Sequence, residues 1–304
     1  MKARAGDRPG FALLAVLWVL VGVAALGLLL QMTAREAQGT AANRIGMQRA
    51  RWEAQGCLAR ANAAVVQASD AAPIADSVWQ QIDVVIARAR ETVGCTIDVA
   101  PLGITLDVNG ATAAQLRQLA TAAGVREPAA DSLAAAILDW LDADDEPRAD
   151  GAERGWYVRA GRMPPPNGPV GSVSALRGVR GLEQLPGVDS LLGTEPGRIL
   201  LTRAPLPVLA SLPGFGAEVL ARVAERRSAR APLNLMMLSA MVGVDARRAL
   251  LGGQPAFSSL VTDIPDAWLI TARAGDGVTT PRVSVELKVV RSGNRLAVLR
   301  RRSW

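Results

Sequence analysis

The chain has 304 residues, of which 50% are apolar and 20% are charged, so it is neither disordered nor collagen-like. It contains no histidine and only two cysteines, which excludes Ser-His-Asp and Cys-His nucleophiles and the usual zinc sites. The net charge is +6, but only Lys2 and Lys288 are lysine, and an arginine bias is as typical of a GC-rich genome as of a nucleic-acid-binding surface. We expect no enzyme activity.

The amino-terminal segment has the composition of a membrane anchor. Lys2, Arg4 and Arg8 precede an uncharged, mostly apolar stretch over residues 11–33. About 20 apolar residues span a bilayer as a helix, and the positive flank predicts a cytoplasmic amino terminus with an exported remainder. A cleaved secretory signal is the alternative, but the apolar stretch is longer than usual and no clear small-x-small cleavage site follows it. We therefore predict a single-pass inner-membrane protein.

A helical stripe continues beyond the membrane segment. Small or apolar residues recur at steps of seven, four, three, four and three; they are Ile45, Trp52, Gly56, Ala59, Ala63 and Val66. This spacing predicts one face of a long helix. The simpler interpretation is that the stripe faces the protein's own core, and the alternative is that it packs against neighbouring subunits.

Strand patterns lie at both ends of the remaining chain. A loop at Pro73 and a short helix over residues 78–90 precede two β-branched runs within residues 93–108, which predict a hairpin turning at 101–103. Near the end, apolar and polar residues alternate over 283–289, and a Ser292-containing turn leads to a strand over 295–300. With residues 267–272, these strands form one predicted antiparallel sheet.

The segment between these strands is predicted to be an all-helical insert over residues 109–257. Similar helix-turn-helix units begin at residues 109 and 201, and a weaker third unit begins at 172. Residues 212–216 (Leu-Pro-Gly-Phe-Gly) resemble the turn of a helix-hairpin-helix motif, and four arginines follow them at 222, 226, 227 and 230. A membrane-anchored DNA-binding protein is therefore the alternative function, whereas tight helix packing is the structural explanation of the glycines.

Residues 139–153 (DWLDADDEPRADGAE) carry seven carboxylates and one arginine inside an otherwise basic chain. Clustered carboxylates on a flexible loop suit a hard cation such as calcium, although the spacing is not that of an EF-hand. The candidate ligands are Asp139, Asp142, Asp144, Asp145 and Asp150. A solvated acidic loop without metal is the equal alternative.

The leader resembles a type IV prepilin signal. A short basic leader ends at Gly10, and an apolar helix begins at Phe11. The resemblance implies that prepilin peptidase cleaves between these two residues and that the new amino terminus is methylated. Most members of this class have glutamate at the fifth mature position, where this chain has Ala15.

The acidic run, together with residues 106–111 and the proline-rich 164–169, resembles the type II secretion system minor pseudopilin family, general secretion pathway protein K. The resemblance extends from the leader to the carboxyl terminus. It implies an α+β fold in which a long transmembrane helix packs on an antiparallel pseudopilin sheet that is interrupted by a large helical insert. It also strengthens the expectation of a structural calcium ion.

The resemblance implies a domain order and a role. The expected parts are the leader (1–10), the transmembrane helix (11–33), the first part of the pseudopilin domain (34–108), the insert (109–257) and the second part of the pseudopilin domain (258–304). The expected role is a non-enzymatic tip subunit of the periplasmic pseudopilus that starts its assembly and supports export of folded proteins. The expected partners are other minor pseudopilins, prepilin peptidase, the inner-membrane secretion platform and exported proteins, with no nucleic acid.

Cys57 and Cys95 are expected to form a disulfide, because two cysteines in an exported domain can pair and would join distant segments of one core. Two buried free thiols are the alternative.

Overall fold

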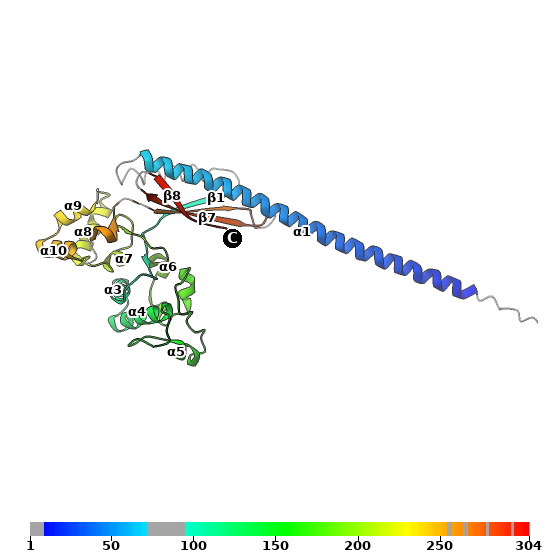
Figure 1. The fold of residues 1–304 in the computed structure, drawn as a ribbon, viewed down its shortest axis with the longest axis horizontal. Helices are drawn as coiled ribbons and strands as arrows, with labels where there is room; N and C mark the ends of the chain where they lie inside the picture. Colours follow the sequence, from blue (N-terminus) through cyan, green and yellow to red (C-terminus); the bar gives the residue numbers. More distant parts are fainter. Residues whose placement is uncertain are drawn as a thin grey trace, which may run out of the picture.

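A computed structural model describes residues 9–71, 95–253, 257–263, 265, 267–277, 280–292 and 295–303. It consists of a long helix lying on a four-stranded sheet, with a mostly helical body on the other side of the sheet (Figure 1). The α+β fold class expected from the sequence is confirmed. The predicted loop at Pro73 and the predicted helix over 78–90 lie outside the described residues.

Helix α1 runs from Pro9 to Ala71 without a break. At a rise of 1.5 Å per residue its 63 residues extend about 95 Å, so its first half projects well away from the rest of the molecule (Figure 1). Within the described residues it is the one helix long and apolar enough to cross a membrane. Its second half packs on the sheet through residues spaced three or four apart. They are Ala50, Ala54, Cys57, Leu58, Ala61 and Val65.

The sheet has the strand order β1-β6-β7-β8, and all neighbouring strands are antiparallel. Its strands are β1 (Cys95–Pro101), β6 (Ala267–Ala274), β7 (Val283–Ser292) and β8 (Arg295–Ser303). Alternate residues of each strand face α1, because side chains along a strand point to opposite faces. The face towards α1 is apolar; among its buried residues are Ile97, Trp268, Ile270, Ala272, Val285 and Val289.

The predicted hairpin near the carboxyl terminus is confirmed, because β7 and β8 pair along their length; residues 293 and 294 of its turn lie outside the described part. The hairpin predicted over 93–108 is wrong. Strand β1 pairs with β6, and the short β2 (Leu106–Asp107) instead pairs in parallel with β3 (Leu192–Gly193).

After Pro101 the chain turns away from the sheet, and its backbone forms hydrogen bonds with segments that are distant in sequence. The Leu102 N–H donates to the Ala267 carbonyl (2.9 Å), and the Gly103 carbonyl accepts from the Leu200 N–H (2.7 Å). Gly103 has φ +82°, and a Cβ there would overlap the Arg198 carbonyl oxygen, so only glycine fits this approach. The Pro-Leu-Gly turn therefore directs the chain into the insert.

The insert is mostly helical. Its elements are α3 (Ala113–Ala122), α4 (Glu127–Leu141), α5 (Arg154–Arg159), η1 (Val173–Gly178), η2 (Leu182–Gln184), α6 (Val188–Leu191), α7 (Leu206–Ala210), α8 (Ala217–Ser228), α9 (Leu235–Met241), α10 (Val244–Gly252) and α11 (Phe257–Leu260). It is not all-helical, because β2 pairs with β3 and β4 (Ile199–Leu200) pairs with β5 (Val261–Thr262). These short parallel pairs join segments that are distant in sequence.

The described residues form two separate apolar cores. One lies between α1 and the sheet, and the other lies inside the insert and extends from Leu106 to Val261. The insert core is built from Leu, Val and Ala, with Trp140, Tyr157 and Phe215 as its buried aromatic residues. The sheet with α1 and the insert are therefore each stabilised by a hydrophobic core of their own. The exact boundaries expected from the sequence, at 109 and 257, stay a prediction.

A charged cluster joins the two parts across the face of the sheet opposite α1. Glu195, which follows β3, accepts a hydrogen bond from Lys288 of β7 (2.7 Å) and forms an ion pair with Arg300 of β8. Arg300 also binds Glu286 (3.1 Å). The Lys288 side chain is only 9% exposed, so the ion pairs occur at a buried contact between insert and sheet.

Cys57 of α1 and Cys95 of β1 form a disulfide in the structure, with a Cα–Cα distance of 6.7 Å. The bond joins the helix to an edge strand of the sheet within the same core.

Candidate functional site

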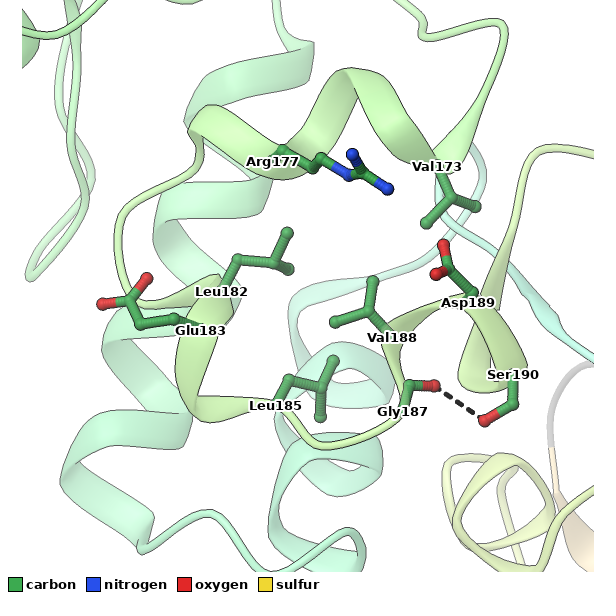
Figure 2. A pocket seen from close by; sticks show the side chains of 9 residues that line it. All are labelled: Val173, Arg177, Leu182, Glu183, Leu185, Gly187, Val188, Asp189 and Ser190. Carbon is green, nitrogen blue, oxygen red and sulfur yellow. Dashed lines mark hydrogen bonds between the residues drawn. The ribbon is translucent and has the colours of Figure 1, made fainter.

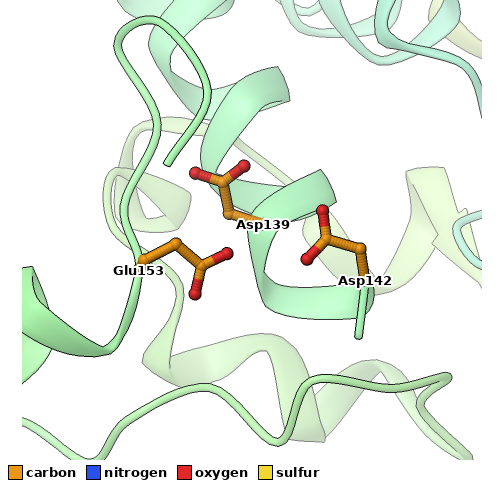
Figure 3. A group of neighbouring side chains, drawn as sticks. All are labelled: Asp139, Asp142 and Glu153. Atoms are coloured by element: carbon orange, nitrogen blue, oxygen red, sulfur yellow. The ribbon is translucent and has the colours of Figure 1, made fainter. Parts of the chain in front are cut away.

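Three carboxylates converge at the end of α4. Asp139 lies in its last turn, Asp142 is its C-cap, and Glu153 is the N-cap of α5. One oxygen from each lies within 4.8 Å of the others, and the three side chains face a common space (Figure 3). Asp139 and Asp142 meet because residues i and i+3 share a helix face. Glu153 joins them because the loop of residues 143–152 folds back.

Gly151 allows this close approach. A Cβ at this position would overlap Oδ2 of Asp139, so the backbone before Glu153 lies against the carboxylate. The Gly151 N–H donates to the Arg148 carbonyl (2.9 Å), which closes the turn.

The cluster is buried and incompletely satisfied. Asp139 is fully buried and Glu153 is 4% exposed. Neither side-chain oxygen of Glu153, nor Oδ1 of Asp142, has a hydrogen-bond partner of normal geometry. Buried carboxylate oxygens without partners are unfavourable unless a proton or a cation compensates them.

The pKa of Glu153 also indicates that the cluster needs a proton or a cation. Burial and the neighbouring Asp139 charge raise the pKa of Glu153 to about 7, and the Arg154 amide only partly opposes them. Without a metal, the Glu153 carboxyl is therefore partly protonated near neutral pH.

Arg148 partly neutralises the cluster. Its Nη1 donates to Oδ1 of Asp139 (2.7 Å) and also contacts Oδ2 of Asp142. Its backbone N–H lies 3.3 Å from both oxygens of Asp139. Hydrogen bonds to the two aspartates raise the pKa of Arg148 further, so the guanidinium is always charged.

The donor set fits calcium. Three carboxylates supply up to six oxygens, which is the ligand type that calcium prefers. The unpartnered oxygens of Glu153 and Asp142 are available for such an ion. The residues present therefore fit a divalent hard cation, and they would hold it as a structural ion.

The structure brings only two of the five expected ligands into this group. Asp144 accepts a hydrogen bond from the Glu146 N–H, and Asp145 binds the Asn167 side chain. Asp150 has φ +62°, and its carbonyl accepts from the Ser132 hydroxyl. These three do not belong to the cluster, and Glu153 takes their place. Its position directly before the helical pattern of α5 is the available sequence signal, since acidic residues favour helix N-termini.

Aromatic packing holds α5 against α4. Tyr157 is fully buried, and its ring contacts those of Trp140 and Trp156 edge to face, with centroids 5.1 Å and 5.0 Å away. The Tyr157 hydroxyl accepts from the Arg180 N–H (3.0 Å). This packing fixes the helix that carries Glu153 at its start.

The outer face of α1 is a second candidate site. The stripe of Ile45, Trp52, Gly56, Ala59, Ala63 and Val66 faces away from the sheet, and all but Val66 are exposed. Ile45 is 70% and Trp52 is 71% exposed. The core-facing interpretation of the stripe is therefore wrong, because the residues on the opposite side of the helix pack on the sheet. We call these six residues the outer stripe.

Gly10 and Phe11 lie in the first turn of α1, at the amino end of its apolar segment. This places the expected processing site directly before the membrane-spanning part.

The helix-hairpin-helix resemblance has a structural explanation. Gly214, at φ +82°, packs against the backbone of α10, where a Cβ would overlap Leu250. The Glu218 carboxylate accepts from the Gly243 N–H (2.7 Å), which joins α8 to the start of α10. Nearby arginines are also engaged: Arg222 pairs with Glu225, and Arg227 donates to the Ala204 carbonyl.

A hollow of about 550 Å³ lies elsewhere on the insert, around η1, η2 and α6 (Figure 2). Its lining residues are Val173, Arg177, Leu182, Glu183, Leu185, Gly187, Val188, Asp189 and Ser190. Arg177 and Asp189 point towards it from different elements, whereas Glu183 points away. The hollow is amphipathic and separate from the carboxylate cluster.

The part of the chain that holds the carboxylate cluster resembles a known protein family. Residues 99–185, which contain the whole carboxylate cluster, match the family described as Type II secretion system (T2SS), protein K. A solved structure, the GspK-GspI-GspJ complex from the type 2 secretion system of enterotoxigenic Escherichia coli, contains a similar chain. The TM-score is 0.58 at 15% identity, and the match covers 84% of this chain and 96% of the other. No curated protein matches. The resemblance to protein K seen in the sequence is confirmed.

Proposed function

We propose that this chain, a pseudopilin of the protein K type, is a minor subunit at the tip of a periplasmic pseudopilus, where it starts assembly together with other minor pseudopilins. The outer stripe carries the proposal. It is an exposed row of small and apolar residues on the part of α1 that continues the membrane-spanning segment. The similar chain in the GspK-GspI-GspJ complex supports a shared assembly of this kind.

The shape of the outer stripe suits helix-helix contact. Gly56, Ala59 and Ala63 project little beyond the helix backbone. Such small residues let two helix backbones approach closely. Trp52 and Ile45 add large apolar surface towards the membrane end. We infer that the stripe packs against the α1-like helices of neighbouring minor pseudopilins.

Two features of this chain support the proposed tip position. The insert adds a large helical body beside the sheet (Figure 1), which would hinder a subunit from stacking over it, and Ala15 provides no carboxylate for pairing with the amino group of a subunit above. Lys2, Arg4 and Arg8 support a cytoplasmic leader, cleavage between Gly10 and Phe11 by prepilin peptidase, and a periplasmic body. The inner-membrane secretion platform and exported proteins are further proposed partners.

The role we propose is structural, not catalytic. Calcium held by Asp139, Asp142 and Glu153 would order the loop between α4 and α5, and it would compensate carboxylates that are otherwise unpartnered. We do not propose DNA binding, because arginines that follow the hairpin bind groups of the same chain. Arg222 pairs with Glu225, and Arg226 and Arg227 donate to backbone carbonyls.

An arginine in the outer stripe tests the proposal. Ala59→Arg places a long charged side chain on the contact face, and we expect the full-length chain to lose co-purification with the other minor pseudopilins from detergent-solubilised membranes. Its melting temperature should stay unchanged, because Ala59 is exposed. Ala114→Arg, on the exposed face of α3, is the matched control and should co-purify normally. Normal co-purification of Ala59→Arg would refute the assignment of this face.

A further inference from the structure

We propose that Arg148 is a built-in counter-ion that occupies the cation position of the carboxylate cluster and must leave when calcium binds. The inference rests on the calcium site proposed above. It adds that the affinity of the site is set by competition with a residue of the same chain.

The guanidinium and a cation need the same oxygens. Nη1 of Arg148 contacts Oδ1 of Asp139 and Oδ2 of Asp142 at once, so it lies between the two aspartates. A divalent ion that bridges these aspartates would bind there. Two cations within about 4 Å repel each other strongly where water is scarce, so both cannot share this position.

Arg148 is attached in a way that permits exchange. Its side chain is 42% exposed, whereas that of Asp139 is fully buried, so the arginine reaches the cluster from solvent. Its backbone is fixed independently, because its N–H donates to Asp139 and its carbonyl accepts from Gly151. The side chain can therefore swing into solvent while the loop keeps its turn.

Arg148 does not bind the third carboxylate of the cluster, Glu153. It bonds to Asp139 and Asp142, whereas both oxygens of Glu153 lack a partner of normal geometry. A guanidinium at this point compensates two of the three acids, and an ion with six or more ligand positions reaches all three. The exchange therefore favours the ion wherever calcium is abundant.

The test is a calcium titration of the full-length chain in detergent after treatment with a chelator. We compare wild type, Arg148→Gln and Arg154→Gln by isothermal titration with calcium chloride. Arg154→Gln removes the same charge close to the cluster, in the first turn of α5, but the Arg154 side chain is 59% exposed and pairs with Asp145 (3.6 Å), outside the cluster. If Arg148 fills the site nine-tenths of the time, its removal should tighten calcium binding about tenfold. The control should change binding by less than about twofold.

Each outcome decides one point. Tighter binding by Arg148→Gln alone, together with a lower melting temperature of this variant in chelator, supports the counter-ion. Equal or weaker binding by Arg148→Gln, with wild type binding normally, overturns it. Absence of calcium binding by wild type refutes the calcium site itself. If Arg148→Gln unfolds in chelator, calcium release from the loaded protein is measured instead; slower release than wild type is expected, and equal or faster release overturns the inference.

Discussion

Asp139 and Asp142 lie at the carboxyl end of α4, where the helix dipole already makes negative charge unfavourable. Glu153 adds a third carboxylate, and Arg148 supplies one positive charge to Asp139 and Asp142. The cluster thus retains excess negative charge in a buried setting, which is the physical reason to expect a bound cation.

Calcium should therefore stabilise the protein. We expect the full-length chain to melt at a higher temperature with calcium than with chelator, because an ion that binds the folded state alone adds its binding free energy to stability. Asp142→Asn should reduce this difference. Asp189→Asn, an exposed carboxylate outside the cluster, should preserve it. Equal melting temperatures of wild type in both buffers would leave only a solvated acidic loop.

The sequence predicts part of this site. Asp139 and Asp142 follow from the acidic run and the i, i+3 spacing at a helix end. Glu153 does not, because its place depends on the path of the loop and on the missing side chain of Gly151. Asp144, Asp145 and Asp150 have the right chemistry, but the turn directs them to other partners.

At the scale of elements, the β7–β8 hairpin was predictable because its period-two pattern is local. A strand was also predicted where β1 lies, but its pairing was not, since its partner β6 is distant in sequence. The outer stripe shows a second limit of prediction from sequence. Periodicity identifies a helix face but not what covers it, and α1 has a second, alanine-rich face that packs on its own sheet.

The disulfide between α1 and β1 should contribute measurably to stability. It closes a loop of 38 residues, for which the chain-entropy relation gives about 4 kcal/mol. We expect Cys57→Ser to lower the urea midpoint of unfolding substantially.

Thiol titration of unreduced, denatured wild type should find no reactive cysteine, and two reactive thiols per chain would disprove the bond. As a control for placing a serine hydroxyl in this core, Ala61→Ser should destabilise much less.

At the scale of the whole molecule, Glu195 connects the insert to the sheet. Burial tends to raise its pKa, but hydrogen bonds from Lys288 and Arg300 outweigh this and lower it below the usual value of 4.5. Two further acids lie near this group. Glu286 binds Arg300, and burial, with a smaller contribution from the Glu195 charge, raises the pKa of Asp107 in β2.

The sign of the pH effect follows from the lowered pKa. The ion pairs of Glu195 stabilise the folded state above about pH 4.5, and this contribution is lost as the pH falls below that value. Glu195→Gln should cost about 2 kcal/mol at neutral pH, because the buried Lys288 would lose its charged hydrogen-bond acceptor.

Urea unfolding from pH 7 to pH 3 measures both effects. The difference between wild type and Glu195→Gln should shrink as the pH falls below 4.5, whereas the exposed Glu183→Gln should follow wild type throughout. A difference that is constant with pH would show that the ion pairs do not link insert and sheet.

The central claim is that this chain is processed and assembled as a pseudopilin, and mass spectrometry of the mature amino terminus tests it most directly. The full-length chain, isolated from membranes of a cell with an active prepilin peptidase, should begin at Phe11 and carry one methyl group on its amino nitrogen. Gly10→Val should block cleavage and retain the leader, while Gly22→Val, inside the anchor, should be processed normally. An intact Met1 in the wild-type protein, or cleavage far beyond Phe11, would contradict the account.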